Sequence, residues 1–303
     1  MSLKSRRPLL KLALGASLCL ALTAGAAGVG EIGQPAPHIA FETLDYRDEL
    51  LNRDPALTEA VLAFFGLETG TYFWEDDLVA SQAWDGLGQR RSNQVVQLPD
   101  GRVLLASMRT LSTGEERTAL LADAQGNLQA VALAHLQCGK KCLPHEQRRL
   151  TVFLRAGVGQ ASAEPLVAWG RRDPDPEADA GAPRPVQVEF RTVDPGSAER
   201  AAPPAVPAGM PGKVPLYPYS RRARDDNNQR GQAVFLTPHS VAQVAAYYRK
   251  LAQSDRQVRW NDGGEAGGVL WFKRGKGEGI VEVSPQRNDP LTRVRIEYSP
   301  VAP

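Results

Sequence analysis

The segment LQAVALAHLQCGKKCLPHEQRRLTVFL, residues Leu128–Leu154, is the stretch around which the predicted fold is organised. Its first nine residues and its last five are rich in aliphatic side chains, and a short polar stretch separates them. Two such runs around a loop predict two neighbouring β-strands, Leu128–Leu136 and Leu150–Leu154. The loop also gathers the most reactive side chains of the chain, because Cys138 and Cys142 lie there between His135 and His145.

On either side of this segment, the sequence predicts further strands joined by tight turns. An Asp-Gly pair at 100–101 and a glycine at 126 are typical turn residues, because glycine adopts positive φ without strain. Consecutive strands with short turns form an antiparallel meander. Alternating apolar and polar residues at 186–191 predict a strand that rejoins this sheet. The other predicted strands are Val95–Leu98, Arg102–Met108, Thr118–Ala122 and Pro165–Trp169.

A helix is predicted to begin after Asp54 and to cover one face of the meander. Asp54 can cap the free N–H groups of the first turn, and Pro55 suits the first helical position. Leu57, Val61 and Phe65 recur at helical spacing, which indicates one apolar face, and Gly66 is a typical helix end.

Composition predicts a boundary between two domains. Residues 195–213 contain five prolines among alanines and glycines, which is typical of a semi-extended linker that builds no core. We therefore expect an antiparallel-sheet domain over 27–194, the linker over 195–213, and a small domain over 214–303. Both domains are of the α+β class.

The small domain is predicted to be a β-α-β-β-β unit. Gln232–Leu236 is the first strand, and the pair Ser240 and Gln243 forms a capping box that opens a helix. The elements predicted after the helix are Gln257–Trp260, the hairpin Val269–Lys273 with Gly279–Val283, and Val294–Tyr298.

This last third of the chain resembles a small α+β module that recurs in exported bacterial proteins. The resemblance is carried by Val214-Pro-Leu-Tyr-Pro218, Phe235-Leu-Thr-Pro238, Ser240-Val-Ala-Gln-Val244, Tyr248-Arg-Lys-Leu251 and Trp260; Ser220-Arg221 departs from the small residues usual after Tyr-Pro. The module has no assigned activity, so the resemblance implies a fold and an exported location and not a reaction.

The N-terminus has the features of a secretory signal. Lys4, Arg6, Arg7 and Lys11 form a basic n-region, Leu9–Leu22 is a short apolar core, and residues 24–26 form a small-residue cleavage site. Leu18 stands before Cys19, where a lipoprotein signal has Gly or Ala, so lipidation is not expected. We predict a periplasmic protein with a signal peptide over residues 1–26.

Charge and hydropathy argue against nucleic acid binding and against a membrane span after the leader. The predicted leader holds four of the 36 Lys and Arg and none of the 34 Asp and Glu, so the mature chain has 32 against 34, a formal net charge of −2. A near-neutral chain argues against nucleic acid as the main partner, because phosphate binding needs a clustered positive surface. No later run of about 18 apolar residues exists that could span a membrane.

Two chemistries are open for the cysteine loop. In an oxidising compartment, Cys138 and Cys142 are expected to pair as a structural disulfide. The closed loop is short, so the disulfide adds only about 2 kcal/mol to the free energy of unfolding. The alternative is a zinc or copper site, or a thiol-redox site, that uses Cys138, Cys142, His135 and His145. No cofactor is otherwise expected, and His135 is also placed to be a packed core histidine.

Two further clusters are candidate partner-binding sites. Trp74 precedes the acidic triplet 75–77, which we interpret as a solvated edge, with a hydrolytic carboxylate pair as the weaker alternative. Arg221, Arg222 and Arg224 form the densest basic patch, but two aspartates follow them directly. The sequence therefore favours a non-enzymatic binding or envelope accessory protein whose partner is another envelope protein, with the metal or thiol-redox function as the alternative.

Overall fold

The structure, a computed structural model, describes residue 39 and residues 50–74, 77–89, 93–110, 115–137, 148–172, 186–194, 204, 215–223, 231–274 and 277–299. The predicted signal peptide lies outside the described residues, and so does the predicted linker apart from Pro204. The division into two domains stays a prediction. The described residues form an α+β fold with two six-stranded sheets and a two-stranded sheet, β1 (Thr69–Gly70) with β2 (Asp77–Leu78).

The first six-stranded sheet contains the predicted meander. Its strand order is β3-β4-β5-β6-β7-β8, and the neighbours from β3 to β7 pair antiparallel. The strand predicted near 186–191 does rejoin the sheet, but β8 pairs parallel with β7, so the sheet is mixed. The strands are β3 (Gln94–Gln97), β4 (Val103–Met108), β5 (Arg117–Ala122), β6 (Leu128–Leu136), β7 (Arg148–Arg155) and β8 (Gln187–Val193).

The predicted strand Pro165–Trp169 is wrong, because these residues lie in helix α3 (Glu164–Gly170), which follows the 3-10 helix η4 (Gln160–Ala163). Pro165 lies in the first turn of α3, where its missing N–H has no helical partner to lose. Ala163, Leu166, Val167 and Gly170 are spaced three, one and three residues apart, which is a helical and not an alternating pattern.

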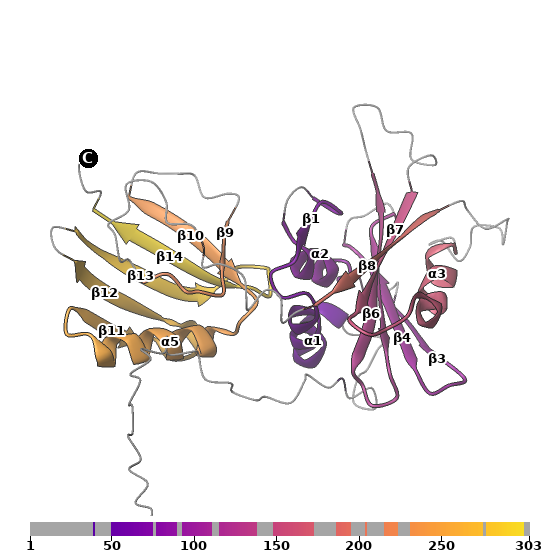
Figure 1. Cartoon of the computed structure of the whole chain (residues 1–303), viewed down its shortest axis with the longest axis horizontal. Coiled ribbons are helices and arrows are strands. Elements are labelled where there is room, and N and C mark those ends of the chain that lie inside the picture. The colour runs from indigo at the N-terminus through magenta and orange to yellow at the C-terminus, as the bar shows by residue number, and fades with distance from the viewer. Residues whose placement is uncertain are drawn as a thin grey trace, which may run out of the picture. The chain divides into compact units, whose positions relative to one another are not determined.

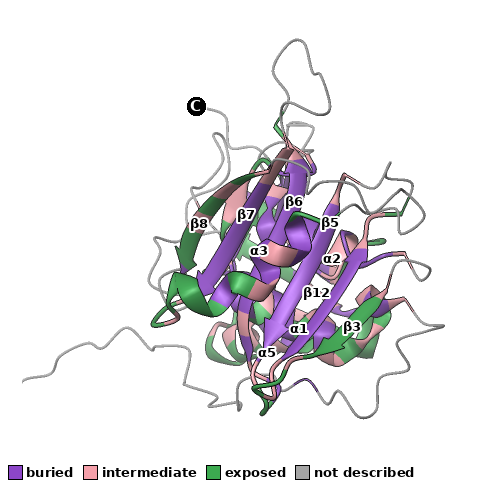
Figure 2. Cartoon of the chain, turned by 90° about the vertical axis from the view of Figure 1, so that its right-hand side faces the viewer, coloured by how far each residue is buried: buried purple, intermediate pink, exposed green. Residues whose placement is uncertain are grey.

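Helices cover both faces of this sheet, whereas the sequence predicted cover on one face. Helix α1 (Pro55–Phe65) has the predicted bounds, and the N–H of Leu57 donates to Asp54 Oδ1 at 2.8 Å. With α2 (Val79–Asp85) it packs on one face, and α3 packs on the other (Figure 1). Every residue of β5 is buried as a result (Figure 2). The face under α3 is rich in alanine, which lets the helix approach closely; its alanines are Ala106, Ala119, Ala130, Ala132 and Ala134.

The second sheet has one strand more after its helix than the predicted β-α-β-β-β unit, and a short strand β9 (Arg221–Arg222) before it. The hairpin counted as one element consists of two full strands, and the sheet is antiparallel with the order β11-β12-β13-β14-β10-β9. Its elements are β10 (Gln232–Thr237), α5 (Val241–Ser254), β11 (Val258–Asp262), the 3-10 helix η5 (Gly264–Ala266), β12 (Gly268–Arg274), β13 (Gly277–Pro285) and β14 (Thr292–Tyr298).

Helix α5 covers one face of this second sheet. Its predicted capping box is present, with Ser240 and Gln243 bonded reciprocally. The hydroxyls of Tyr248 and Tyr247 donate to the backbone oxygens of Pro215 at 3.0 Å and Leu216 at 3.2 Å. These bonds fix the segment that carries the Tyr-Pro pattern against the helix. The opposite face of the sheet has no helix packed on it among the described residues.

Candidate functional site

The face of the second sheet that α5 does not cover carries an exposed tryptophan. Side chains alternate along β12, so Leu270 and Phe272 are buried in the core that includes α5 residues, whereas Trp271 and Lys273 point to the other face. The side chain of Trp271 is 57 % exposed. Large aromatic side chains are normally mostly buried, so an exposed one on a sheet face marks a candidate binding surface.

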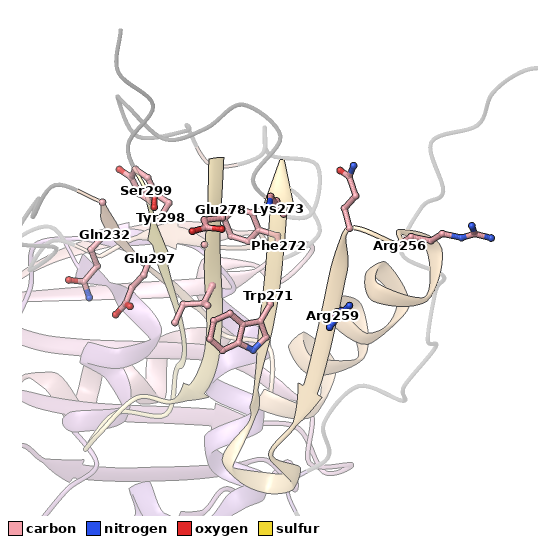
Figure 3. Close-up of a pocket in the computed structure, with 14 residues that line it drawn as sticks. Gln232, Arg256, Arg259, Trp271, Phe272, Lys273, Glu278, Glu297, Tyr298 and Ser299 are labelled. Atoms are coloured by element: carbon pink, nitrogen blue, oxygen red, sulfur yellow. The ribbon is translucent and has the colours of Figure 1, made fainter. Parts of the chain in front are cut away.

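A groove of about 1160 Å³ surrounds this tryptophan. In Figure 3, Trp271 projects from β12, with Arg259 on β11 to one side and Glu297 on β14 to the other. The lining residues come from β10 to β14 and from the turn between α5 and β11. They are Gly231, Gln232, Arg256, Gln257, Arg259, Trp271, Phe272, Lys273, Glu278, Gly279, Ile280, Glu297, Tyr298 and Ser299. We call this set the Trp271 groove.

The strand register places five of these residues in one row across the sheet. Arg259 lies opposite Trp271, Trp271 opposite Ile280, Ile280 opposite Glu297, and Glu297 opposite Gln232. Directly opposed residues project from the same face. Four strand spacings of about 4.8 Å give the row a length of roughly 19 Å, which is about the length of six extended residues.

The charges of the Trp271 groove are unevenly compensated. The side chains of Arg256, Arg259 and Lys273 make no hydrogen bond or ion pair with any described residue. Glu297, by contrast, already has a cationic partner, because Arg295 Nη1 lies 3.2 Å from its Oε1. Arg256 and Arg259 therefore leave the end of the groove at β11 cationic and available to an outside partner, whereas Lys273 lies directly opposite Glu278 in the register.

His135 is in the sheet core, and its three predicted co-ligands lie outside the described residues. The imidazole is buried, packs edge-on against Tyr72 with 5.1 Å between ring centroids, and has Nε2 3.0 Å from Thr151 Oγ1. Burial lowers the pKa of His135 to about 4, so the ring is neutral at pH 7. Among the described residues, no three His, Cys, Asp or Glu side chains are grouped to hold a metal ion. The pairing and the metal binding of Cys138, Cys142 and His145 stay predictions.

The side chain of Trp74 is held by local contacts and is only partly accessible. Its Nε1 donates to Asp77 Oδ2 at 2.8 Å, and the Arg109 guanidinium lies over its ring at 4.9 Å. The other oxygen of Asp77 accepts from the N–H of Leu78 at 2.7 Å. One oxygen of this carboxylate therefore holds the Trp74 indole and the other holds a backbone N–H. Residues 75 and 76 lie outside the described residues.

The structure brings Arg221 and Arg222 to the edge of the second sheet, in β9, where both are exposed. Arg224 lies outside the described residues. Neither β9 arginine belongs to the Trp271 groove.

Sequence reasoning missed the residues of the Trp271 groove, although a signal was present. Within the predicted strand Val269–Lys273, the spacing of two assigns Leu270 and Phe272 to one face and Trp271 to the face of Lys273. A tryptophan on the charged face of a strand is the signal that a period-two reading could have found.

Comparison with known proteins assigns the chain to no group. No family model, no curated protein and no solved structure matches it. No helix of the described part of the chain is long and apolar enough to cross a membrane.

Proposed function

We propose that this chain is an exported periplasmic protein, stabilised by a Cys138–Cys142 disulfide, that acts by binding another envelope protein. The observation that carries the binding function is the 57 % exposed Trp271 in a groove with cations that have no partner among the residues that the structure describes. The signal-peptide pattern supports export, and the rule that close cysteines pair in an oxidising compartment supports the disulfide.

Burial of Trp271 by a partner would supply a large part of the binding energy. A tryptophan offers about 250 Å² of surface, so the exposed fraction is roughly 140 Å², worth about 3 kcal/mol when it is removed from water. Tryptophan and arginine are also the residues most enriched among those that dominate protein–protein binding energies. The groove places both types side by side, with Trp271 opposite Arg259.

The charges and the shape of the groove favour an acidic, extended polypeptide segment as the occupant. Carboxylates of the segment would pair with Arg256, Arg259 and Lys273, while its apolar side chains would pack on Trp271 and Ile280. The row of roughly 19 Å accommodates about six extended residues. An anionic glycan would satisfy the same cations, but it would leave Ile280 without an apolar partner.

The test is the affinity of the purified mature protein for a fluorescein-labelled octapeptide of the repeated sequence Glu-Glu-Leu-Leu, measured by fluorescence anisotropy. As an extended segment, this peptide presents both residue types on each face. We expect saturable binding that weakens as salt rises, because exposed charge pairs are screened. Arg259→Glu should weaken binding at least about tenfold, or 1.4 kcal/mol. Lys250→Glu is the matched control, because it makes the same charge change on exposed α5, outside the groove.

Two comparisons complete the experiment. The corresponding octapeptide of repeated Lys-Lys-Leu-Leu should bind much more weakly than the acidic one, and so should an anionic muramyl disaccharide. Equal binding of both octapeptides, preferential binding of the disaccharide, or an equal effect of the two charge reversals would overturn the proposal.

A further inference from the structure

Strand β3 is a sheet edge without the protection that the other edges have. Of the edge strands of the two six-stranded sheets, β8 carries Glu189 and Arg191, β9 consists of two arginines, and β11 carries Arg259 and Asp262. Charged side chains keep an exposed edge from pairing with other strands. β3, with the sequence Gln-Val-Val-Gln, contains no charged residue and no proline.

The apolar side chains of β3 are unusually exposed. All four residues of the strand are exposed, and Val95 and Val96 are 38 % and 39 % exposed. With Trp271 they are the exposed large hydrophobic residues of the described chain. Figure 2 shows β3 as an exposed strand at the edge of its sheet. A neutral edge with exposed β-branched residues is suited to pairing with another strand.

The hydrogen-bond phase of β3 defines which groups face outward. The N–H of Leu98 donates to the oxygen of Arg102 at 2.8 Å, and in an antiparallel pair the bonded residues alternate. Gln94, Val96 and Leu98 therefore direct their backbone groups to β4. Val95 and Gln97 direct theirs away from the sheet, and no described strand pairs with them.

We infer that β3 pairs antiparallel with β3 of a second copy of this chain. The register that satisfies every outward group of β3 sets Val95 opposite Gln97 of the second copy, and Gln97 opposite Val95, with four N–H···O bonds. The twofold axis then passes beside Val96, which faces Val96 of the second copy as a non-hydrogen-bonded pair, the type with the closest side chains. Such a contact is the same on both copies and closes after two. This pairing is independent of the Trp271 groove.

A second copy suits this edge because nothing in it opposes self-pairing. The paired residues are all neutral, so no like charges meet across the axis, and each valine buries apolar surface. The contact is short, so the dimer is expected to be weak, with a Kd on the order of 100 µM.

The first test uses charge complementation in sedimentation velocity with the full mature chain. The native protein should show a concentration-dependent dimer, whereas Val96→Lys and Val96→Glu should each be monomeric because like charges face each other at the axis. An equimolar mixture of the two variants should dimerise again. Gln253→Lys, which introduces a charge on exposed α5 outside β3, is the control and should behave as native. A monomeric native protein at about 500 µM, or a monomeric mixture, would overturn the inference.

The second test reports the register. The two Val96 Cα atoms would be about 4.5 Å apart in a non-hydrogen-bonded pair, which is within disulfide range. Val96→Cys should therefore give a disulfide-linked dimer under mild oxidation, and Val95→Cys should not, because Val95 faces Gln97 of the second copy. Self-pairing in this register would be contradicted if both cysteine variants formed the disulfide-linked dimer equally, or if Val96→Cys formed disulfides only with unrelated proteins.

Discussion

Replacement of Gln82 by leucine is expected to lower the free energy of unfolding by about 3 kcal/mol. Gln82 lies in α2 and is fully buried. Its Oε1 accepts from the N–H groups of Tyr72 at 3.1 Å and Phe73 at 2.8 Å, and its Nε2 donates to the oxygen of Gly70 at 2.8 Å. Three buried bonds of ordinary length are worth about 1 kcal/mol each, and leucine has a similar size but can form none of them.

Two longer contacts make this magnitude a lower bound. Oε1 also lies 3.4 Å from the N–H donor of Trp74, and Nε2 lies 3.3 Å from the oxygen of Asp77. The side-chain amide of Gln82 thus holds the backbone of residues 70–77 at several points. If water cannot reach the groups that lose their partner, each costs about 1–3 kcal/mol.

The assay is urea-induced unfolding followed by far-ultraviolet circular dichroism. Gln253→Leu is the control, because Gln253 is exposed in α5, and its replacement should change stability by less than about 0.5 kcal/mol. Gln82→Glu should also destabilise at pH 7, since a carboxylate accepts from the amides but cannot donate to the carbonyls. A free energy of unfolding of Gln82→Leu within about 0.5 kcal/mol of the native value would refute this reasoning.

Three further outcomes are expected. Burial lowers the folded pKa values of His135 and His239 to about 4, below the unfolded value of 6.5. The stability that this difference contributes is complete above pH 6.5 and is lost as the pH falls toward 4. Thermal unfolding measured at several pH values should show this loss, and His135→Phe should show a shallower pH dependence. Gly267→Ala should cost at least about 2 kcal/mol in urea unfolding, because its φ is +107° and a Cβ would lie 1.8 Å from a backbone oxygen of β13, whereas Gly159→Ala, with open space around it, should change little. Ser240→Ala should lower stability by about 1 kcal/mol in the same assay, since the capping box of α5 is lost.

The fold could be predicted best where local signals and tertiary packing agree. Asp54, Pro55 and Gly66 define α1 because capping and backbone preferences act within a few residues. The strands from β3 to β7 were predictable because each is a run of apolar residues that ends at a turn. The α+β class follows from these two kinds of element.

The errors arise where one short apolar run fits two structures. Residues 165–169 have four apolar side chains among five residues, and only Pro165 and the spacing to Ala163 and Gly170 favour α3 over a strand. The parallel pairing of β8 depends on a long connection after β7, which no local pattern encodes.

The candidate site was harder to predict because it depends on which groups lack partners. The candidates predicted from the sequence were rare residue types, mainly cysteine and histidine. Among them, His135 was correctly interpreted as a candidate core histidine. The Trp271 groove consists of common residues on five different strands, in the turn after α5 and next to the strands. Their alignment follows from the register, and the register of five strands cannot be read from one sequence.

The most direct test of partner binding through the Trp271 groove is a calorimetric titration of the acidic glutamate–leucine octapeptide into the native protein, Trp271→Ala and Lys250→Ala. Loss of the indole should weaken the affinity by at least about tenfold, toward the hundredfold that 3 kcal/mol implies, while Lys250→Ala should bind as native. An unchanged affinity in Trp271→Ala, with its fold intact by circular dichroism, would contradict the central role of this groove.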